Sequence, residues 1–449
     1  MENEQIYVKK LDISLATEAV FEHFAHLPNA ILLDSCNAAH VNSRFDIIAI
    51  EPTHLLTAQN GQIFLDGIEQ ASSCFNIMKA HLASLSTTKA PYELPFNGGW
   101  LGYFSYDLGR YIEKLPEQAH RDIELPDMHI GLYLDALIYD NVHAQWYYVS
   151  QPNAQRITRY LTHLSEDAIP HTPFVLTTDW SSNMTQDQYT EKFEQIQKYL
   201  KSGDCYQINL AQRFSAHYQG SPWHAYKKLR SQNKAPFSAF MSVHQSAILS
   251  VSPERFLLVD NDKVETKPIK GTLPRMIDPD DDKRQAERLA NSPKDRAENV
   301  MIVDLLRNDL GKVAKPGSVQ VPSLFAIESF PAVHHLVSTV TSELAQDQCA
   351  VDQLQAAFPG GSITGAPKIR AMEIIEELEP HRRSAYCGSI GYVSACGRMD
   401  TSITIRTLVC NKETIHCWAG GGIVADSKVD LEYQETYHKV NKILPILAS

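Results

Sequence analysis

The sequence predicts an α+β fold with large antiparallel or mixed sheets. Strand-like segments repeatedly follow one another after short connections. These connections exclude a purely parallel sheet, because parallel neighbours are joined by crossovers of about a dozen residues or more. No internal repeat is visible in the chain. With 449 residues, of which 43% are hydrophobic and 21% are charged, the chain is long enough for a large core and for more than one domain.

Composition and charge narrow the classes of function. The formal net charge of -12 argues against a nucleic-acid partner, because phosphates require a basic face. No apolar run approaches the length of a membrane span, and no signal peptide is recognised, so we expect a cytoplasmic protein without membrane contact. The eight cysteines are scattered without a Cys-x-x-Cys pair, which is typical of reduced thiols rather than of zinc or disulfide sites.

The first half of the chain gives mixed signals, and its elements are predicted from short apolar and aromatic runs. In order, the predicted elements are a helix at 16–26, strands at 30–35 and 43–50, a strand with bulges at 97–105, two strands within 128–150 separated at 140–141, and a short helix at 154–164. The glycines within 97–105 favour a bulged strand over a phosphate loop.

Residues 167–183 contain Pro170, Pro173 and several serines and threonines, a composition typical of a connection. We therefore expect two subdomains, residues 1–166 and residues 184–449.

The second half alternates helices with groups of strands. In order, the predicted elements are a helix at 185–201, a strand at 206–214, a helix, strands at 238–243, 247–251 and 255–259, helices at 280–290 and 292–307, strands within 317–343, a glycine loop at 358–368 leading into a helix through 377, strands at 385–395, 399–410 and 414–418, a glycine segment at 419–423, and a final helix at 429–447. The helix start at Ser292 is the clearest, with a serine cap, a proline at the first helical position and an acid three residues after the cap.

The segment 267–275, Lys-Pro-Ile-Lys-Gly-Thr-Leu-Pro-Arg, is the first candidate for a chemical site. Lys267 and Arg275 flank Lys270 with positive charge, which lowers the pKa of an amine and predicts a partly neutral, nucleophilic Lys270. Gly271 permits a ligand to approach the backbone closely. For this segment taken alone, the simpler interpretation is a surface strand that carries a solvated lysine, and the other motifs along the chain favour the chemical site.

Two predicted helices each carry two acids three residues apart, Asp295 with Glu298 and Glu432 with Glu435. Residues at this spacing lie on one face of a helix. For either pair alone the simpler interpretation is that acids at a helix start interact favourably with the helix dipole. Together, oxygens from two helices predict a Mg²⁺ site, because this ion takes one or two carboxylates directly and keeps several waters.

The loop 358–368 places glycines and hydroxyls ahead of a helix whose free N–H groups can hold an anion, so it predicts either a carboxylate site or an ordinary turn. It is not a Walker A loop, because the spacing to its lysine does not match. Arg406 either faces solvent or binds a carboxylate through two hydrogen bonds. Three further residues also have ordinary interpretations. His335 can be a histidine of a strand, Tyr392 can pack in the core, and Lys439 can lie on the exposed face of the last helix.

Taken together, these segments resemble the chorismate-utilising enzyme family over residues 186–441. The motifs that carry the resemblance are Ser252-Pro-Glu254, Pro268-Ile-Lys-Gly-Thr272, Ala297-Glu-Asn-Val-Met-Ile-Val-Asp-Leu-Leu-Arg-Asn-Asp309, Ser362-Ile-Thr-Gly-Ala-Pro-Lys368, Gly388-Ser-Ile-Gly-Tyr392, Asp400-Thr-Ser-Ile-Thr-Ile-Arg406, Ala419-Gly-Gly-Gly-Ile-Val424 and Glu435-Thr. The resemblance implies one interwoven α/β sandwich of two subdomains, with mostly antiparallel sheets, helices on the outside, and strands of the first half added to the same sheets.

The resemblance implies chorismate as substrate and Mg²⁺ as cofactor. It implies that one chorismate carboxylate binds through magnesium held by Glu298 and Glu435, with Asp295 and Glu432 contributing directly or through water. It assigns the other carboxylate to Arg406, Lys439 and the amides near Gly421 and Gly422. The further substrate-binding residues that it implies are His335, Ser362, Thr364, Gly365 and Tyr392.

Lys270 separates the branches of this family, because anthranilate synthases carry alanine at the corresponding position. A lysine there is similar to the folate-pathway branch, which forms 4-amino-4-deoxychorismate. In the implied chemistry Lys270 attacks ring carbon C2 while Glu254 protonates the departing C4 hydroxyl, and ammonia then replaces the lysine. The alternatives are an anthranilate or isochorismate synthase, or a non-catalytic protein that senses chorismate or tryptophan and would need neither Glu254 nor Lys270.

The resemblance also implies a heterodimer with a glutamine amidotransferase subunit as the source of ammonia. None of the eight cysteines lies in a Gly-x-Cys-x-Gly nucleophile loop, so this chain should depend on such a partner or on free ammonium. In the first half, residues resemble the tryptophan pocket of relatives, and the resemblance leaves open whether tryptophan binds here and whether it regulates. These residues are Asp34, Ser35, Ser43, Arg44 and Phe45.

Overall fold

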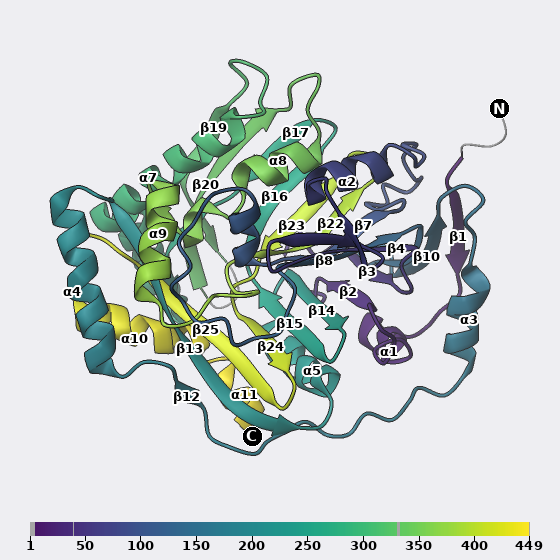
Figure 1. Ribbon diagram of the computed structural model, residues 1–449, viewed down its shortest axis with the longest axis horizontal. Coiled ribbons are helices and arrows are strands. Elements are labelled where there is room, and N and C mark those ends of the chain that lie inside the picture. Colours follow the sequence, from purple (N-terminus) through teal and green to yellow (C-terminus); the bar gives the residue numbers. More distant parts are fainter. Residues whose placement is uncertain (1–4, 39, 330–332, 449) are drawn as a thin grey trace.

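The computed structural model describes residues 5–38, 40–329 and 333–448, which form two large antiparallel sheets with helices on the outside (Figure 1). The largest core cluster draws buried residues from both sheets, for example Trp100 and Ile130 from one and Met241 and Ile248 from the other. Full burial of a large apolar side chain contributes about 1.5–3 kcal/mol. The predicted α+β sandwich of mostly antiparallel sheets is confirmed.

The first sheet has thirteen strands and joins strands from both halves of the chain. Along its main path these are β1 (Tyr7–Leu11), β10 (Gln145–Ser150), β9 (Asp135–Asp140), β3 (Phe45–Ala49), β2 (Ile31–Asp34), β14 (Phe237–Val243), β15 (Ser246–Ser252), β24 (Thr407–Asn411), β25 (Thr414–Ile423), β13 (Gln207–Gln219) and β11 (Val175–Leu176). Two short strands, β12 (Ser181–Ser182) and β21 (Gly365–Ala366), pair with β13 off this path.

The second sheet has twelve strands and likewise joins strands from both halves of the chain. Along its main path these are β18 (Ile269–Pro274), β20 (Val333–Glu343), β17 (Lys263–Thr266), β16 (Arg255–Asp260), β23 (Met399–Ile403), β22 (Ser389–Ser394), β7 (Gly99–Phe104), β8 (Met128–Tyr133), β4 (His54–Gln59), β5 (Gln62–Leu65) and β6 (Ile68–Gln70). A further strand, β19 (Gln320–Ser329), pairs with β20.

The helices cover the outer faces of the sandwich, and Figure 1 shows α4, α9 and α10 grouped beside β13 and β25. The α-helices are α1 (Thr17–Glu22), α2 (Cys74–Leu82), α3 (Ile157–Ser165), α4 (Gln186–Ser202), α5 (Pro222–Asn233), α6 (Pro279–Ala290), α7 (Pro293–Gly311), α8 (Ala350–Ala357), α9 (Lys368–Leu378), α10 (Val429–Val440) and α11 (Leu444–Ala448). Two 3-10 turns are η1 (Tyr106–Tyr111) and η2 (Gly361–Ile363). The predicted start of α7 is confirmed, since Asp295 N donates to the hydroxyl of the cap Ser292 at 3.3 Å.

The chain passes from one sheet to the other at short breaks. β15 lies in the first sheet and the next strand, β16, lies in the second, while β23 lies in the second and β24 in the first. The two connections, residues 253–254 and 404–406, lie side by side because β15 pairs with β24 and β16 pairs with β23. These crossings form the frame of the candidate site.

Three of the sequence-based boundaries are wrong. Residues 128–150 form three strands and not two, because the chain leaves β8 for the other sheet at Leu134. Residues 399–410 form two strands, because the connection 404–406 leads into the other sheet. The final helix is divided into α10 and α11, near Pro445, which lacks the N–H that a continuous helix requires.

The expectation of bulges in β7 is also wrong, because its registers with β22 and β8 are continuous. A Cβ at Gly99 would lie 2.2 Å from the carbonyl oxygen of Val393, and a Cβ at Gly102 would lie 2.2 Å from that of His129. The glycines therefore permit close approach of the neighbouring strands.

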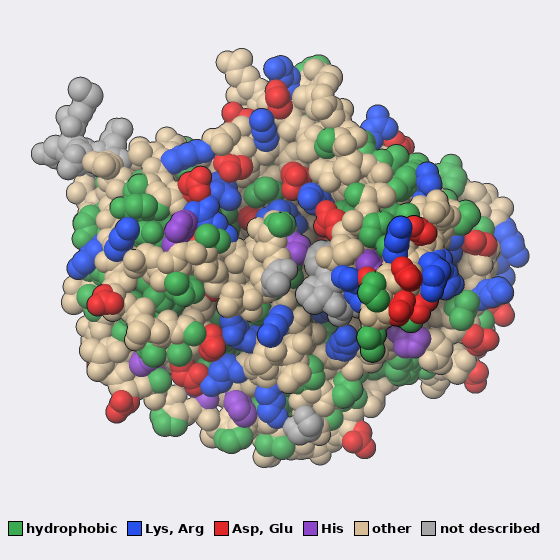
Figure 2. Space-filling model, turned by 180° about the vertical axis from the view of Figure 1, so that it is seen from behind, with side chains coloured by type: hydrophobic (Ala, Val, Ile, Leu, Met, Phe, Trp, Pro, Cys, Tyr) green, Lys and Arg blue, Asp and Glu red, His purple; other side chains and the backbone are tan. Residues whose placement is uncertain are grey.

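The surface seen in Figure 2, from behind the view of Figure 1, intermixes basic and acidic side chains. No helix in the described ranges has both the length and the apolar character that crossing a membrane requires.

Candidate active site

Glu254 and Arg406 lie in the two neighbouring sheet-to-sheet connections. Val251 N donates to the carbonyl of Arg406 at 3.1 Å, and Ile403 N donates to the carbonyl of Glu254 at 3.0 Å. Arg406 has a φ of 50°, in the left-handed region that few non-glycine residues adopt, and this turns the chain from β23 into β24. Backbone hydrogen bonds thus fix the positions from which both side chains extend.

Lys270 enters the same site from β18, at the edge of the second sheet. The register of β18 with β20 shifts between Lys270 and Thr272, around Gly271, which has a φ of 75°. Lys270 Nζ lies 3.5 Å from the carbonyl oxygen of Ser362. Because Ser362 Oγ also donates to Glu254 Oε1 at 3.2 Å, Ser362 connects the two predicted catalytic residues.

The environment favours the neutral forms of both groups. Burial raises the pKa of Glu254 to about 7, although Lys270 and the hydroxyl of Ser362 act in the opposite direction. Burial is also the main cause that lowers the pKa of Lys270; Glu298 opposes the shift and Lys439 adds to it. Because the charged form of each group is disfavoured, Glu254 is suited to donate a proton and Lys270 is suited to act as a nucleophile near neutral pH.

The predicted cause of the Lys270 shift is wrong. Lys267 forms an ion pair with Glu328 at 3.5 Å, and Arg275 forms one with Asp282 at 2.6 Å. Neither flanking cation is among the main causes of the lowered pKa of Lys270, which are burial and Lys439.

Arg406 is a charged group without a protein partner at this site. Its guanidinium makes no ion pair and no hydrogen bond within the described residues, and burial lowers its pKa while Glu254 opposes the shift. The neighbouring His335 is buried, its Nδ1 lies 2.8 Å from Thr272 Oγ1, and burial together with Arg406 lowers its pKa to about 4. A partly buried cation without an ion pair, beside a neutral imidazole, is suited to bind an anion.

The four predicted metal-binding acids lie on α7 and α10, which pack on β18 and β25 respectively. Burial raises the pKa of Glu298 and of Glu432. Burial acts in the same direction on Glu435, but Lys439, whose Nζ lies 2.7 Å from Glu435 Oε1, leaves its pKa lowered. Asp295 lies against the backbone of Gly271, where a Cβ would be 2.8 Å from Asp295 Oδ1.

A lysine joins the two acidic helices. Lys294 Nζ lies 3.9 Å from Glu298 Oε1 on its own helix and 3.7 Å from Glu432 Oε1 on α10. The two acids therefore lie on either side of one lysine amine.

Lys439 and the glycines of β25 lie next to these acids. Lys439 Nζ donates to the carbonyl of Gly420 at 2.7 Å. A Cβ at Gly421 would lie 3.1 Å from Glu432 Oε2 and 3.4 Å from Glu435 Oε1, so glycine lets the strand pass close to the carboxylates.

The loop after α8 supplies the remaining residues. Thr364 is fully buried, and its hydroxyl donates to the carbonyls of Gly360 and Gly361 at 3.2 and 3.3 Å. Gly365 has a φ of 147°, and a Cβ there would lie 2.1 Å from the carbonyl oxygen of Gln207. The threonine hydroxyl shapes the loop, and the glycine lets it approach β13.

Within the described ranges, one group of side chains has its possible metal-ligand atoms close together. It consists of His120, Asp122 and His381 and lies outside the acids of α7 and α10. Arg213 occupies both oxygens of Asp122, at 2.8 and 2.7 Å. Asn183 Oδ1 accepts from Arg213 N, so its amide nitrogen donates to Nδ1 of His381 and leaves the proton on Nε2. Asp122 and His381 therefore take part in a hydrogen-bonded network with Arg213 and Asn183.

Comparison with known proteins agrees with this geometry. The family model described as chorismate binding enzyme matches residues 28–445. The chain belongs to the chorismate binding enzyme family.

Two similar relatives carry the name aminodeoxychorismate synthase component 1. The one from Salmonella typhimurium is 54% identical over 440 residues, covering 96% of this chain and 95% of the relative, and the one from Escherichia coli is 55% identical over 434 residues with the same coverage. Among solved structures, anthranilate synthase component I from Streptococcus pneumoniae matches with a TM-score of 0.80 and 31% identity, covering 90% of this chain and 93% of that chain.

This chorismate binding enzyme has a cavity of about 630 Å³ whose lining does not include Lys270 or Glu254. It is called the second cavity here, to distinguish it from the candidate active site. Asp34, Ser35, Arg44 and Phe45 line it, whereas Ser43 does not. Tyr392, predicted at the substrate site, lines this second cavity as well; its ring packs on Phe96 at 5.9 Å between centroids, and no contact in the described residues brings it to Glu254.

Several of these predicted pocket residues are held by internal bonds. Asp34 accepts from Arg230 at 2.6 Å and from Tyr226 at 2.8 Å. Ser35 Oγ donates to Asp46 at 2.6 Å. Their side chains build the wall of the cavity rather than offering free polar groups to its interior.

Sequence reasoning missed Gln207. Its side chain is buried in β13, neither amide atom has a partner among the described residues, and a Cβ at Gly422 would lie 2.3 Å from its Nε2. Gln207 lies in a strand pattern of polar and apolar residues that gives no functional signal, and only the structure places it beside the glycines of β25.

Proposed function

We infer that this chain converts chorismate and ammonia to 4-amino-4-deoxychorismate, the activity of an aminodeoxychorismate synthase component 1. Relatives at 54% and 55% identity over almost the whole chain carry that name. The observation that carries the inference to this chain is the partly buried amine of Lys270, which shares Ser362 with the buried acid Glu254.

We propose that amination proceeds through a covalent intermediate. The neutral amine of Lys270 attacks C2 of chorismate, the two conjugated ring double bonds each shift by one position toward C4, and the C4 hydroxyl leaves as water with the proton of Glu254. The Glu254 carboxylate then takes the extra proton from the alkylated lysine nitrogen. Ammonia next attacks C4, the two double bonds shift back, and the bond from C2 to Lys270 breaks as the lysine nitrogen regains that proton and the new C4 amine keeps the remaining hydrogens of ammonia. Two easier displacements thus replace one difficult one.

The anion sites suit the two carboxylates of chorismate. Arg406 is partly buried and makes no ion pair within the described residues, and the His335 beside it is neutral. We propose that Arg406 binds one carboxylate through two hydrogen bonds, with Lys439 and the amides near Gly421 supporting it.

The donor set on α7 and α10 fits Mg²⁺, because buried carboxylates with raised pKa values gain from a nearby cation. We propose that Glu298 and Glu435 hold the ion and that Asp295 and Glu432 contribute directly or through water. When bound, the ion supplies positive charge to the second chorismate carboxylate.

Removing one of these acids should weaken metal binding. Glu298→Gln should raise the Kd for Mn²⁺, measured by electron paramagnetic resonance, and the Mg²⁺ concentration for half-maximal activity by at least about tenfold, since ligand changes of this kind typically cost about 10- to 100-fold. Asp304→Asn is the matched control, because Asp304 lies on the exposed side of α7 and pairs only with Arg307 among the described residues. Unchanged Mn²⁺ binding by the Glu298 variant would contradict the assignment.

The ammonia source is a second subunit in this proposal. The designation component 1 belongs to the relatives and implies another component. We propose that this component is a glutamine amidotransferase and that free ammonium replaces it in vitro. The eight cysteines of this chain are all free thiols, in keeping with the cytoplasmic setting that we propose for it.

We propose that the second cavity binds tryptophan. Its volume of about 630 Å³ lies in the range of small-molecule sites. Arg44 and Arg255 line its wall, where each is paired with acids of the chain, so a bound carboxylate would share these cations with them. L-Tryptophan at about 100 times its Kd should stabilise the protein by about 2.7 kcal/mol and raise its Tm. Arg44→Ala should reduce this rise, and D-tryptophan is the control; equal Tm values with and without L-tryptophan would exclude the site.

Product analysis tests the proposed function itself. The purified chain, chorismate, Mg²⁺ and ammonium should yield 4-amino-4-deoxychorismate, identified by its mass and its optical spectrum. Anthranilate or isochorismate as the product would assign the chain to another branch of the family, and unchanged chorismate would indicate a binding protein.

A further inference from the structure

A buried ion pair lies behind the Ser362 turn and touches none of the reacting groups named above. Arg383 is 1% exposed and Glu379 is 5% exposed. Arg383 Nε donates to Glu379 Oε2 at 2.9 Å, and Arg383 Nη2 donates to Glu379 Oε1 at 2.7 Å. Removing two charges from water is costly, so a pair of this kind adds little stability by itself compared with well-packed apolar residues.

The other hydrogen bonds of the pair go to the backbone around the site. Arg383 Nη1 donates to the carbonyl of Ile363 at 2.9 Å, and Nη2 donates to that of Asn209 at 2.8 Å. Glu379 Oε1 accepts from Ala211 N at 2.9 Å. The pair therefore ties the turn η2 to strand β13.

Two tyrosine rings fix the plane of the guanidinium. Its central carbon lies 4.8 Å from the ring centroid of Tyr106 and 5.7 Å from that of Tyr386. A planar guanidinium held in this way donates hydrogen bonds to Glu379 and to two carbonyls at once. The single nitrogen of a lysine cannot reach all of these acceptors.

Ile363 directly follows Ser362, the residue that contacts both Glu254 and Lys270. We propose that Arg383 and Glu379 are a positioning pair that holds the Ser362 turn where its hydroxyl reaches Glu254 and its carbonyl reaches Lys270. The proposal rests on the proposed function, because it assigns the pair an effect on the amination step.

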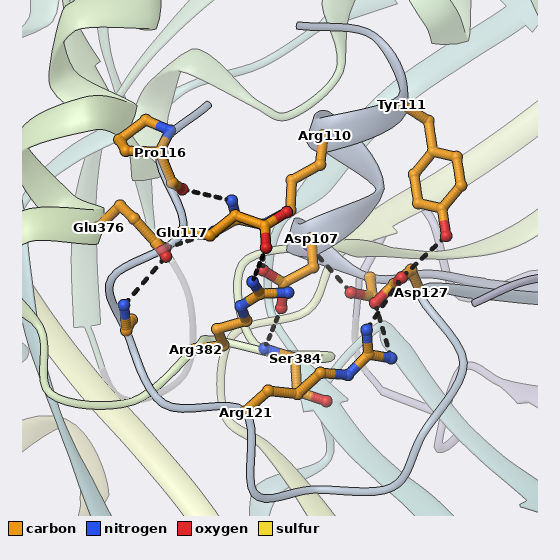
Figure 3. A network of polar contacts seen from close by, with 12 residues as sticks. Asp107, Arg110, Tyr111, Pro116, Glu117, Arg121, Asp127, Glu376, Arg382 and Ser384 are labelled. Atoms are coloured by element: carbon orange, nitrogen blue, oxygen red, sulfur yellow. Dashed lines mark hydrogen bonds and ion pairs between the residues drawn. The ribbon is translucent and has the colours of Figure 1, made fainter. Parts of the chain in front are cut away.

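The structure offers a matched control at the same helix. Arg110 pairs with Glu376 of α9, is also largely buried, and donates to the carbonyl of Pro116 at 2.6 Å (Figure 3). This second pair holds the loop before β8 through Glu376, which accepts from Gln118 N and Ala119 N, and it makes no hydrogen bond or ion pair with the Ser362 turn among the described residues. It shares the chemistry of the first pair but not its position.

Arg383→Lys keeps the charge and removes the fork. We expect kcat with ammonium to fall by about 10- to 100-fold, because a displacement of about 1 Å near the reacting groups has effects of this size. The KM for chorismate should change far less, because Arg406 and the metal site lie elsewhere. Arg110→Lys should leave kcat within about twofold of the wild type, even if Arg110→Lys and Arg383→Lys lower the Tm by similar amounts.

A double-mutant cycle with Ser362→Ala distinguishes positioning from general stability. The loss of kcat caused by Arg383→Lys should be clearly smaller in the Ser362→Ala background, since both changes remove the contact to Glu254. If Arg383→Lys does not fold, Glu379→Gln takes its place in the same cycle, because the amide oxygen still accepts from Arg383.

Additive losses in the cycle, or an equal loss of kcat in Arg110→Lys, would overturn the proposal. Wild-type product analysis with ammonium is performed first. Failure of the wild type to form 4-amino-4-deoxychorismate rejects the proposed function, whereas normal wild-type turnover with additive losses rejects only the positioning pair.

Discussion

Lys270→Ala should lower kcat for chorismate amination by about a thousandfold or more, an effect of the size that loss of a nucleophile has in other enzymes. Burial and Lys439 lower the pKa of the Lys270 amine, and its Nζ lies 3.5 Å from the carbonyl of Ser362. Alanine cannot form the bond to C2, whereas chorismate should still bind through Arg406 and the metal site. The measurement is steady-state amination with ammonium, with the KM for chorismate determined alongside.

Lys267→Ala is the matched control for this variant. Lys267 lies in the same segment, but it forms a partly exposed ion pair with Glu328, and such pairs contribute only about 0–1 kcal/mol. Its loss should change kcat less than about twofold. Near-normal kcat in Lys270→Ala would exclude covalent catalysis by this lysine.

Glu254→Gln should lower kcat by about 100- to 10,000-fold, the range for loss of a general acid. The glutamine keeps an oxygen that accepts from the hydroxyl of Ser362, so the turn should stay in place while the proton for the departing hydroxyl is lost.

The same variant should change the pH profile of kcat/KM. Glu254 has a raised pKa of about 7, so its protonated form is present below that pH and is lost above it. Lys270 has the opposite requirement, because its neutral form increases with pH. The wild-type profile should therefore be bell-shaped, with apparent pKa values that belong to the pair. Glu254→Gln should lose the falling limb and keep the rising one; a retained falling limb would assign it to another group.

The residues of the candidate site could be predicted from the sequence better than the contacts that surround them. Lys270, Glu254 and Ser362 are brought together by hydrogen bonds, and the acids of α7 and α10 face a common lysine. Helix starts were predictable because caps act locally, as at Ser292.

The features that could not be predicted depend on contacts between distant segments. Residues 399–410 have the apolar alternation of one strand, yet Arg406 turns the chain into the other sheet. The flanking cations Lys267 and Arg275 are paired by acids outside their own segment, which a local pattern does not reveal. The sequence did not reveal the pair of Arg383 and Glu379, because its proposed role depends on hydrogen bonds to the carbonyls of Ile363 and Asn209, which are distant in the sequence.

Intact-protein mass spectrometry, followed by peptide mapping, tests the central claim most directly. The protein is incubated with chorismate and Mg²⁺ but without ammonium, quenched and digested. A covalent bond between Lys270 and C2 predicts an adduct with the mass of chorismate less one water on the peptide that contains residue 270, removed by added ammonium and absent from Lys270→Ala. The absence of this adduct from a wild-type protein that turns over chorismate with ammonium, or its presence in Lys270→Ala, would contradict the account.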